Sequence, residues 1–103
     1  MKAKLICYTL KNVNHQKRSK FKREFLGYQD KSNKGKYEYD RKGLLSHLPN
    51  SRPIRSVVIV KTKDEPQVIN LLKKYNAKIK IYNVTINKNE LKIPQGMTHQ
   101  TTS

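Results

Sequence analysis

The sequence predicts an α+β protein, with a small mixed sheet of about five strands that includes a hairpin, one main helix at about residues 64–75, and one short helical turn. Three patterns support this fold class. Residues 54–61 contain a run of four apolar residues, Val57 to Val60, as in a buried strand. Residues 64–75 combine a helix start signal with an apolar stripe. Two alternating runs enclose a loop of turn-forming residues, which is typical of a β-hairpin.

Two further strands complete the predicted sheet. Residues 3–10 are apolar on both sides in the middle, which indicates an internal strand. Residues 78–86 follow the helix, and their apolar positions change side near Tyr82 and Asn83, which predicts a bulge or an end of pairing. If this strand shares a sheet with residues 54–61, the two should run parallel and the crossover between them should be right-handed.

The main helix has recognisable signals at both ends. Asp64 is placed to cap it and Pro66 falls in its first turn, where proline is favoured. Asn76 follows as a left-handed C-cap. The residues of its apolar stripe repeat at helical spacing: Val68, Ile69, Leu72 and Tyr75.

The basic segment after the first strand is predicted to be non-helical. Residues 11–19 are polar and read as a loop, and residues 20–28 alternate as the first hairpin strand. Phe21 and Phe25 would share one face of that strand and pack in the core. Residues 36–41 would form the second hairpin strand.

The remaining segments are a turn and a tail. Residues 43–48 are predicted to form the short helical turn, which ends at Pro49. We expect residues 1–86 to form a single nucleic-acid-binding domain and residues 87–103 a flexible polar tail. The tail has few apolar anchors, namely Leu91, Ile93 and Met97.

The charge of the chain predicts its class of partner. Lys and Arg number 23 against 7 acidic residues, which gives a formal net charge of +16 and a pI near 10.1. A small domain needs a charge of only about 2–8 to stay in solution. The excess favours a polyanionic partner, and nucleic acid before a membrane, since the sequence shows no amphipathic basic helix or lipidation signal.

The sequence also predicts a compartment. Cys7 is the single cysteine, so no intramolecular disulfide can form. No apolar run approaches the ~18 residues of a membrane-spanning helix, and the start of the chain does not read as a signal peptide. We therefore expect a cytoplasmic protein with no membrane partner.

The basic residues concentrate in the first two thirds of the chain, on predicted loops and strand ends where phosphate contacts leave a core undisturbed. Lys outnumbers Arg 18 to 5, which favours phosphate contacts over reading of base edges. The predicted nucleic-acid-binding residues are Lys11, His15, Lys17, Arg18, Lys20, Lys22, Arg23, Lys31, Lys34, Lys36, Tyr37, Arg41, Lys42, Arg52 and Arg55.

Catalysis is not predicted. The three histidines are scattered, and the acidic residues lack the spacing of a metal site. His15, beside Lys17 and Arg18, leaves a metal-independent ribonuclease as an alternative. A DNA-binding protein associated with chromatin or transcription is the other alternative. We expect no cofactor, no metal and no small-molecule substrate.

One stretch of the chain resembles a known family. Residues 25–45 (FLGYQDKSNKGKYEYDRKGLL), followed by Pro49 and the strand at residues 52–60, are similar to a family of small basic archaeal proteins of the large ribosomal subunit. The resemblance covers about residues 20–86. It implies a non-enzymatic, cytoplasmic protein seated on ribosomal RNA beside neighbouring ribosomal proteins, with the basic loop and the tail entering crevices between RNA helices.

Overall fold

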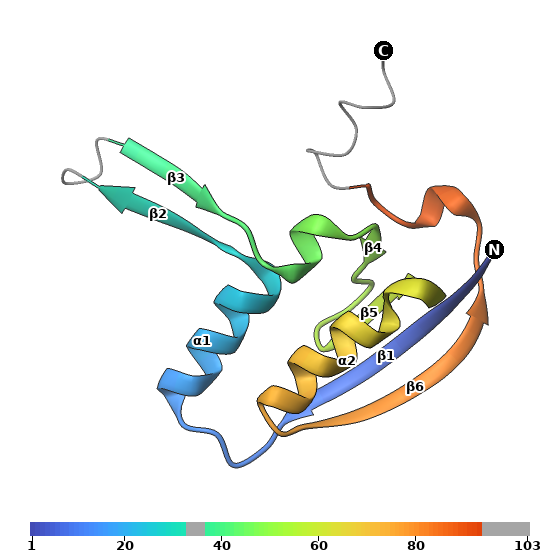
Figure 1. Cartoon of the computed structure of the whole chain (residues 1–103), viewed down its shortest axis with the longest axis horizontal. Helices are drawn as coiled ribbons and strands as arrows, with labels where there is room; N and C mark the ends of the chain where they lie inside the picture. Colours follow the sequence, from blue (N-terminus) through green and yellow to red (C-terminus); the bar gives the residue numbers. More distant parts are fainter. Residues whose placement is uncertain (33–36, 94–103) are drawn as a thin grey trace.

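The computed structural model describes residues 1–32 and 37–93, and its main sheet is built around β1 (Lys2–Leu10; Figure 1). β1 pairs antiparallel with β5 (Val57–Lys61) along one edge and with β6 (Ala77–Thr85) along the other. β4 (Asn50–Ser51) pairs with β5, which gives the order β4-β5-β1-β6. Because β5 and β6 both run antiparallel to β1, they run parallel to each other, as predicted for the strands that flank the helix.

α2 (Glu65–Lys74) is the predicted main helix, shorter by one residue at each end. A 3-10 turn, η2 (Thr62–Asp64), leads into it from β5, and proline occupies its first turn. Asp64 stands at the predicted N-cap position, but its side chain makes no capping hydrogen bond. Tyr75 occupies the C-cap position, and Asn76 directly after it has a φ of 55°, so the predicted left-handed residue at this helix end is confirmed one position beyond the C-cap. The apolar stripe is buried as predicted, with Val68 and Leu72 fully enclosed.

α1 (His15–Leu26) is a helix in the segment where the sequence predicted a loop over residues 11–19 and a strand over residues 20–28. That prediction was wrong, and local contacts explain why. The Asn14 side chain accepts a hydrogen bond of 2.8 Å from the Lys17 backbone N–H and caps the first turn. Phe21 and Phe25 lie four residues apart, which places both on one helical face as readily as on one strand face.

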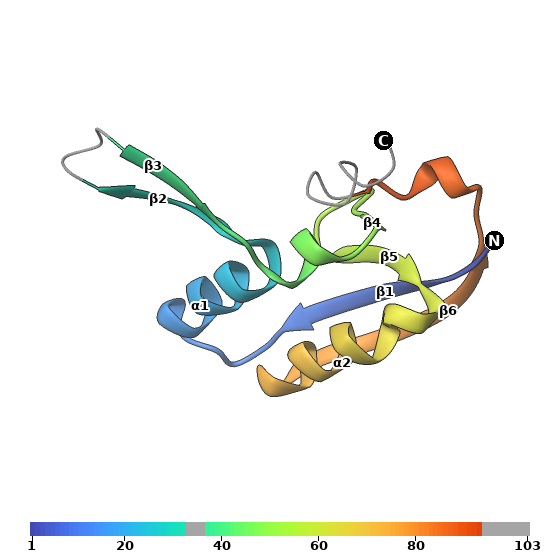
Figure 2. The same cartoon turned by 45° about the horizontal axis from the view of Figure 1, so that its top comes forward.

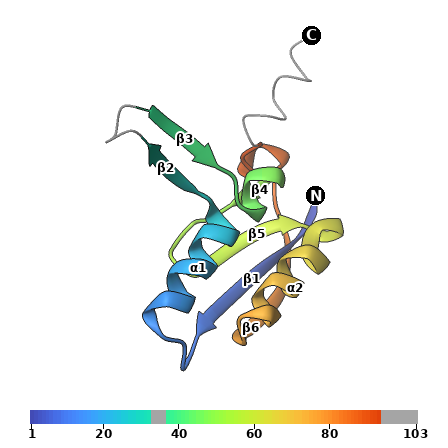
Figure 3. The ribbon, with the colours of Figure 1, turned by 60° about the vertical axis from the view of Figure 1, so that its left-hand side comes forward.

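Both helices cover the same face of the main sheet (Figures 2 and 3). Without the hairpin, the element order is β1-α1-β4-β5-α2-β6. This order, together with the strand order of the sheet, is the ferredoxin-like split β-α-β topology. The predicted α+β class is confirmed, although neighbouring strands of the main sheet are antiparallel throughout the described residues.

The core lies between the helices and this face of the sheet. Ile6 and Val58 are directly opposite each other on β1 and β5, and both are fully buried. Phe25 from α1 and Leu72 from α2 close over them in the same cluster. Tyr8 packs edge-on against Phe25, with 5.4 Å between ring centroids. The predicted burial of both phenylalanines is therefore confirmed, within a helix instead of a strand.

The hairpin consists of β2 (Tyr28–Ser32) and β3 (Tyr37–Arg41) and forms its own two-stranded sheet, which projects away from the rest (Figure 1). Two glycines make its base. Gly27 has a φ of 84°, and a Cβ there would lie 2.5 Å from the Arg41 carbonyl oxygen. A Cβ on Gly43 would collide with the Gly27 nitrogen. The predicted helical turn follows as η1 (Leu44–His47).

Two predictions near the end of the chain need correction. The register between β1 and β6 is continuous from Lys2–Thr85 to Leu10–Ala77, so no bulge occurs at Tyr82. Residues 87–93 are also not a free tail. They contain a short turn, η3 (Lys88–Glu90), and an antiparallel bridge to Asn50. Leu91 is only 5% exposed, and this burial holds the segment against the domain. Residues 94–103 lie outside the described residues.

Candidate nucleic-acid interface

A groove of about 990 Å³ lies between α1 and the connection from β4 to β5, two segments that run side by side in Figures 1 and 3. Its apolar and aromatic lining residues are Tyr8, Leu10, Phe21, Leu26 and Ile54. Its basic lining residues are Arg18, Lys22, Arg52, Arg55 and Lys92, and all five are exposed. Among the described residues that line the groove, none is acidic.

α1 supplies one wall of the groove. Arg18 and Lys22 are four residues apart, so their side chains extend from the same helical face. The first turn of α1 contains no acid and includes Lys17 and Arg18, which is the reverse of what the helix dipole favours. These cations therefore do not stabilise the isolated helix, whereas a bound anion at this end would be stabilised by both the dipole and the cations.

The connection from β4 to β5 supplies the opposite wall, with Arg52 and Arg55. Its backbone is fixed at two points. The Val57 N–H donates to the Ile54 carbonyl at 3.3 Å, and the Tyr8 N–H on β1 donates to the Ser56 carbonyl at 3.0 Å. Ser56 has a φ of 67°, a conformation that costs a non-glycine residue about 1–2 kcal/mol. The fixed backbone holds the two arginines at the rim of the groove.

Lys92 was not among the predicted site residues, because the sequence placed it in a tail. Its backbone exchanges two hydrogen bonds with Asn50, of 2.8 and 3.0 Å, which bring it to the end of the groove. The Asn50 side chain donates to the carbonyls of Leu45 and Leu48 at 2.9 and 2.7 Å, so this corner is anchored to η1. No local pattern around Lys92 predicts this pairing.

Tyr8 forms part of the groove floor, and its ring also packs against Phe21 at a centroid distance of 5.8 Å. Burial raises the pKa of the Tyr8 phenol, and the nearby charge of Arg52 opposes part of this rise. The hydroxyl therefore remains protonated at neutral pH. The groove therefore combines aromatic rings with exposed positive charges.

The structure brings four of the predicted residues together at the groove, namely Arg18, Lys22, Arg52 and Arg55. Others lie elsewhere on or near α1, exposed to solvent: Lys11, His15, Lys17, Lys20 and Arg23. The Arg23 guanidinium lies 4.9 Å from the centre of the Tyr28 ring at the start of the hairpin. The rest of the α1 cations extend the positive surface beyond the groove.

The predicted residues of the hairpin that the structure describes do not line the groove. Lys31 and Tyr37 are placed in β2 and β3, Arg41 ends β3, and Lys42 follows it. Lys34 and Lys36 lie outside the described residues. His15 is the first residue of α1 and does not line the groove. The residue considered as a general base for the ribonuclease alternative therefore lies outside the groove.

Two general features of the described residues also bear on function. No helix among residues 1–32 and 37–93 has the length and apolar content needed to cross a bilayer. Within the same ranges, no three metal-binding side chains gather closely enough to hold an ion.

The chain matches no protein-family model, no curated protein and no solved structure.

Proposed function

We propose that this protein is a non-enzymatic RNA-binding protein that seats on structured RNA through the groove and the basic surface of α1. The observation that supports this proposal best is the groove itself, whose described lining residues include five basic side chains, aromatic rings and no acid. Two of these side chains come from α1, two from the β4–β5 connection and one from the segment after β6. The fold therefore gathers cations from three separate parts of the sequence around one concavity.

The net charge of +16 supports RNA of high phosphate density as the partner. The predominance of lysine favours phosphate contacts over reading of bases in a duplex groove. The resemblance of residues 20–86 to archaeal proteins of the large ribosomal subunit makes ribosomal RNA the first RNA to test. The same chemistry would bind ribosomal RNA within an assembled particle, next to neighbouring ribosomal proteins.

The test is a salt titration of binding to a folded RNA. If the groove contacts four phosphates, affinity should fall by about a hundred-fold between 50 and 200 mM salt. Arg52→Gln combined with Arg55→Gln should lower the slope of log affinity against log salt by about 2. The matched control is Lys63→Gln with Lys73→Gln, which removes the same charge from exposed positions outside the groove. Equal losses in both double variants would contradict the groove as the interface.

Three further comparisons separate the alternatives. Duplex DNA of the same length tests whether the partner is RNA, since an equal affinity would favour DNA binding. Excess protein incubated with folded RNA in EDTA should leave the RNA intact, whereas shorter products would indicate a ribonuclease.

In a sucrose gradient of a native lysate, the protein should sediment with large ribosomal subunits at low salt and leave them at high salt. Protein at the top of the gradient at low salt would contradict the ribosomal assignment.

A further inference from the structure

The main sheet has a second face, opposite the helices, and at its centre this face adds no residue to the core cluster; Ala3, toward its end, is buried outside that cluster. The pairing register places odd-numbered residues of β1 on this face, with their partners on β5 and β6. Leu5 lies between Ile59 and Tyr82, and Cys7 lies between Val57 and Lys80. None of these residues belongs to the core cluster or packs against it.

This face is open over its centre. Both helices lie on the other side of the sheet in Figures 2 and 3. Leu5, Cys7, Val57 and Ile59 are half-buried, whereas Ala3, toward the end of the same face, is only 1% exposed. Tyr82 is 50% exposed and lies on β6 at the edge of this apolar surface. The centre of this face is therefore an apolar surface with the exposed Tyr82 ring at its edge.

The strand residues of this face carry charge of a single sign. The four strands of the main sheet contain no acidic residue. Lys61, Lys78 and Lys80 occupy the same face as Tyr82, because each pairs with an odd-numbered residue of β1. Lys80 is adjacent to Tyr82 along this face of β6. An occupant that complements these lysines must be negatively charged and must present flat apolar groups to the ring.

The open face also continues from the groove. Thr9 and Ser51 line the groove, and the register places both of them on the open face, opposite Lys78 and Ile59. A chain that leaves the groove at this end therefore reaches the sheet without crossing either helix. This continuity and the lysines point to the same class of ligand at both surfaces.

We propose that the open face of the sheet binds an unpaired, single-stranded segment of nucleic acid, with a base stacked on Tyr82 and phosphates against Lys61, Lys78 and Lys80. Base stacking on an aromatic side chain is largely independent of sequence. The site would thus hold a single strand that continues from the structured RNA in the groove. This inference rests on the proposed function and adds to it a second surface with a different preference.

The experiment is a titration of the isotope-labelled full chain with an eight-nucleotide oligouridylate, followed by NMR of the backbone amides. The amides of β1, β5 and β6 around Leu5, Ile59 and Tyr82 should shift. Tyr82→Ala should weaken oligouridylate binding by about ten-fold, whereas Tyr82→Phe, which keeps an aromatic ring, should bind as tightly as the wild type. The matched control is Ile81→Ala, because Ile81 is similarly exposed, at 41%, but lies on the opposite face of the same strand.

Each outcome either supports or overturns the proposal. Equal effects of Tyr82→Ala and Ile81→Ala, or shifts confined to the groove, would overturn it. Amide shifts that depend on protein concentration without oligonucleotide would mean that a second copy covers this face, which also overturns it. If folded RNA still binds and still responds to the Arg52→Gln and Arg55→Gln pair, the proposed function survives such a failure. If neither RNA binds, both proposals fail.

Discussion

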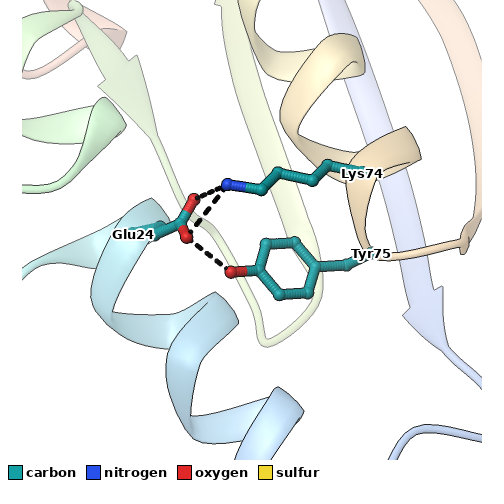
Figure 4. Close-up of polar contacts among 3 residues, drawn as sticks. All are labelled: Glu24, Lys74 and Tyr75. Carbon is teal, nitrogen blue, oxygen red and sulfur yellow. Dashed lines mark hydrogen bonds and ion pairs between the residues drawn. The ribbon is translucent and has the colours of Figure 1, made fainter.

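The Tyr75 hydroxyl donates a hydrogen bond of 2.6 Å to Oε1 of Glu24, and this bond joins the end of α2 to α1 (Figure 4). The same carboxylate accepts from the Lys74 ammonium, with distances of 3.2 and 3.1 Å to its two oxygens. The Tyr75 ring packs edge-on against Phe21, at a centroid distance of 5.4 Å. The two helices are thus joined both by an apolar contact and by a polar one directly outside it. Since α1 forms one wall of the groove, this junction positions Arg18 and Lys22.

Tyr75→Phe should lower the free energy of unfolding by about 1–2 kcal/mol, because it removes a hydrogen bond to a charged acceptor. Chemical denaturation of Tyr75→Phe, Glu24→Gln and the double variant measures the coupling between the two residues. Lys74→Met is the control, since its ion pair is 59% exposed on the lysine side and should contribute less than about 1 kcal/mol. Additive effects of the first two substitutions would mean that the bond does not stabilise the fold.

The same junction predicts a pH dependence at both extremes. The hydrogen bond from Tyr75, and then Lys74, hold the pKa of Glu24 below its ordinary value of 4.5. A lowered pKa stabilises the fold above pH 4.5, and this contribution is lost as the pH falls through the folded-state value. Burial and the Glu24 carboxylate raise the pKa of Tyr75 from 10.0 to about 12. That contribution is complete below pH 10 and is lost between pH 10 and about 12.

These losses can be measured as differences between variants. The free energy of unfolding of the wild type minus that of Glu24→Gln should be constant near neutral pH and shrink below pH 4.5. The corresponding difference for Tyr75→Phe should shrink above pH 10. A difference that stays constant across either range would refute the corresponding shift.

Phe21→Ser should cost about 3–5 kcal/mol, because the ring is 3% exposed and packs among Tyr8, Phe25 and Tyr75. The loss would appear as a lower midpoint in thermal or chemical unfolding. Lys20→Ser, at the preceding and exposed helical position, is the control and should stay within about 1 kcal/mol of the wild type. A small effect at Phe21 would argue against the packing of α1 on the sheet.

Leu91→Ala should cost about 2–3 kcal/mol, because Leu91 is 5% exposed and holds residues 87–93 against the domain. Ile93→Ala is the matched control, since Ile93 is 49% exposed and should contribute little. The measurement is the free energy of unfolding of both variants. Equal, small effects would support the original prediction of a free segment after residue 86.

Gly43→Ala should destabilise the protein by more than about 2 kcal/mol, because its Cβ would collide with the backbone of Gly27 and of the end of α1. Backbone atoms cannot move aside as a flexible side chain can. Lys42→Ala, at the adjacent exposed position, should change stability by less than about 0.5 kcal/mol. A Gly43→Ala variant as stable as this control would show that the base of the hairpin can open.

The elements that the sequence predicted well have two independent signals each. α2 has an apolar stripe and residues suited to both ends, and Asn76 adopts the left-handed conformation expected after it. β1 has an apolar run in its middle, and the polar residues Lys11 and Asn12 follow it. α1 was missed because its buried surface depends on Phe21 and Phe25, whose spacing of four fits both a helix and a strand. Asn14 before it and Gly27 after it were the cap signals that indicated a helix.

The sequence predicted several of the basic residues of the candidate site, but it did not predict that they line one groove. Charge alone selected Arg18, Lys22, Arg52 and Arg55 among many other basic residues. Their convergence depends on α1 lying beside the β4–β5 connection, which follows from the packing of the whole fold. Lys92 reaches the groove through main-chain bonds to Asn50, and main-chain pairing of this kind leaves no pattern in the side chains.

The contact between Gly27 and Gly43 makes the hairpin an arm of adjustable length. At its base, the backbones of Gly27 and Gly43 come into close contact. Adding or removing one residue pair would shift the tip along the same line by about 3.4 Å per residue, without moving the core. Natural or engineered variants can therefore change how far this arm extends while the groove and the sheet keep their geometry.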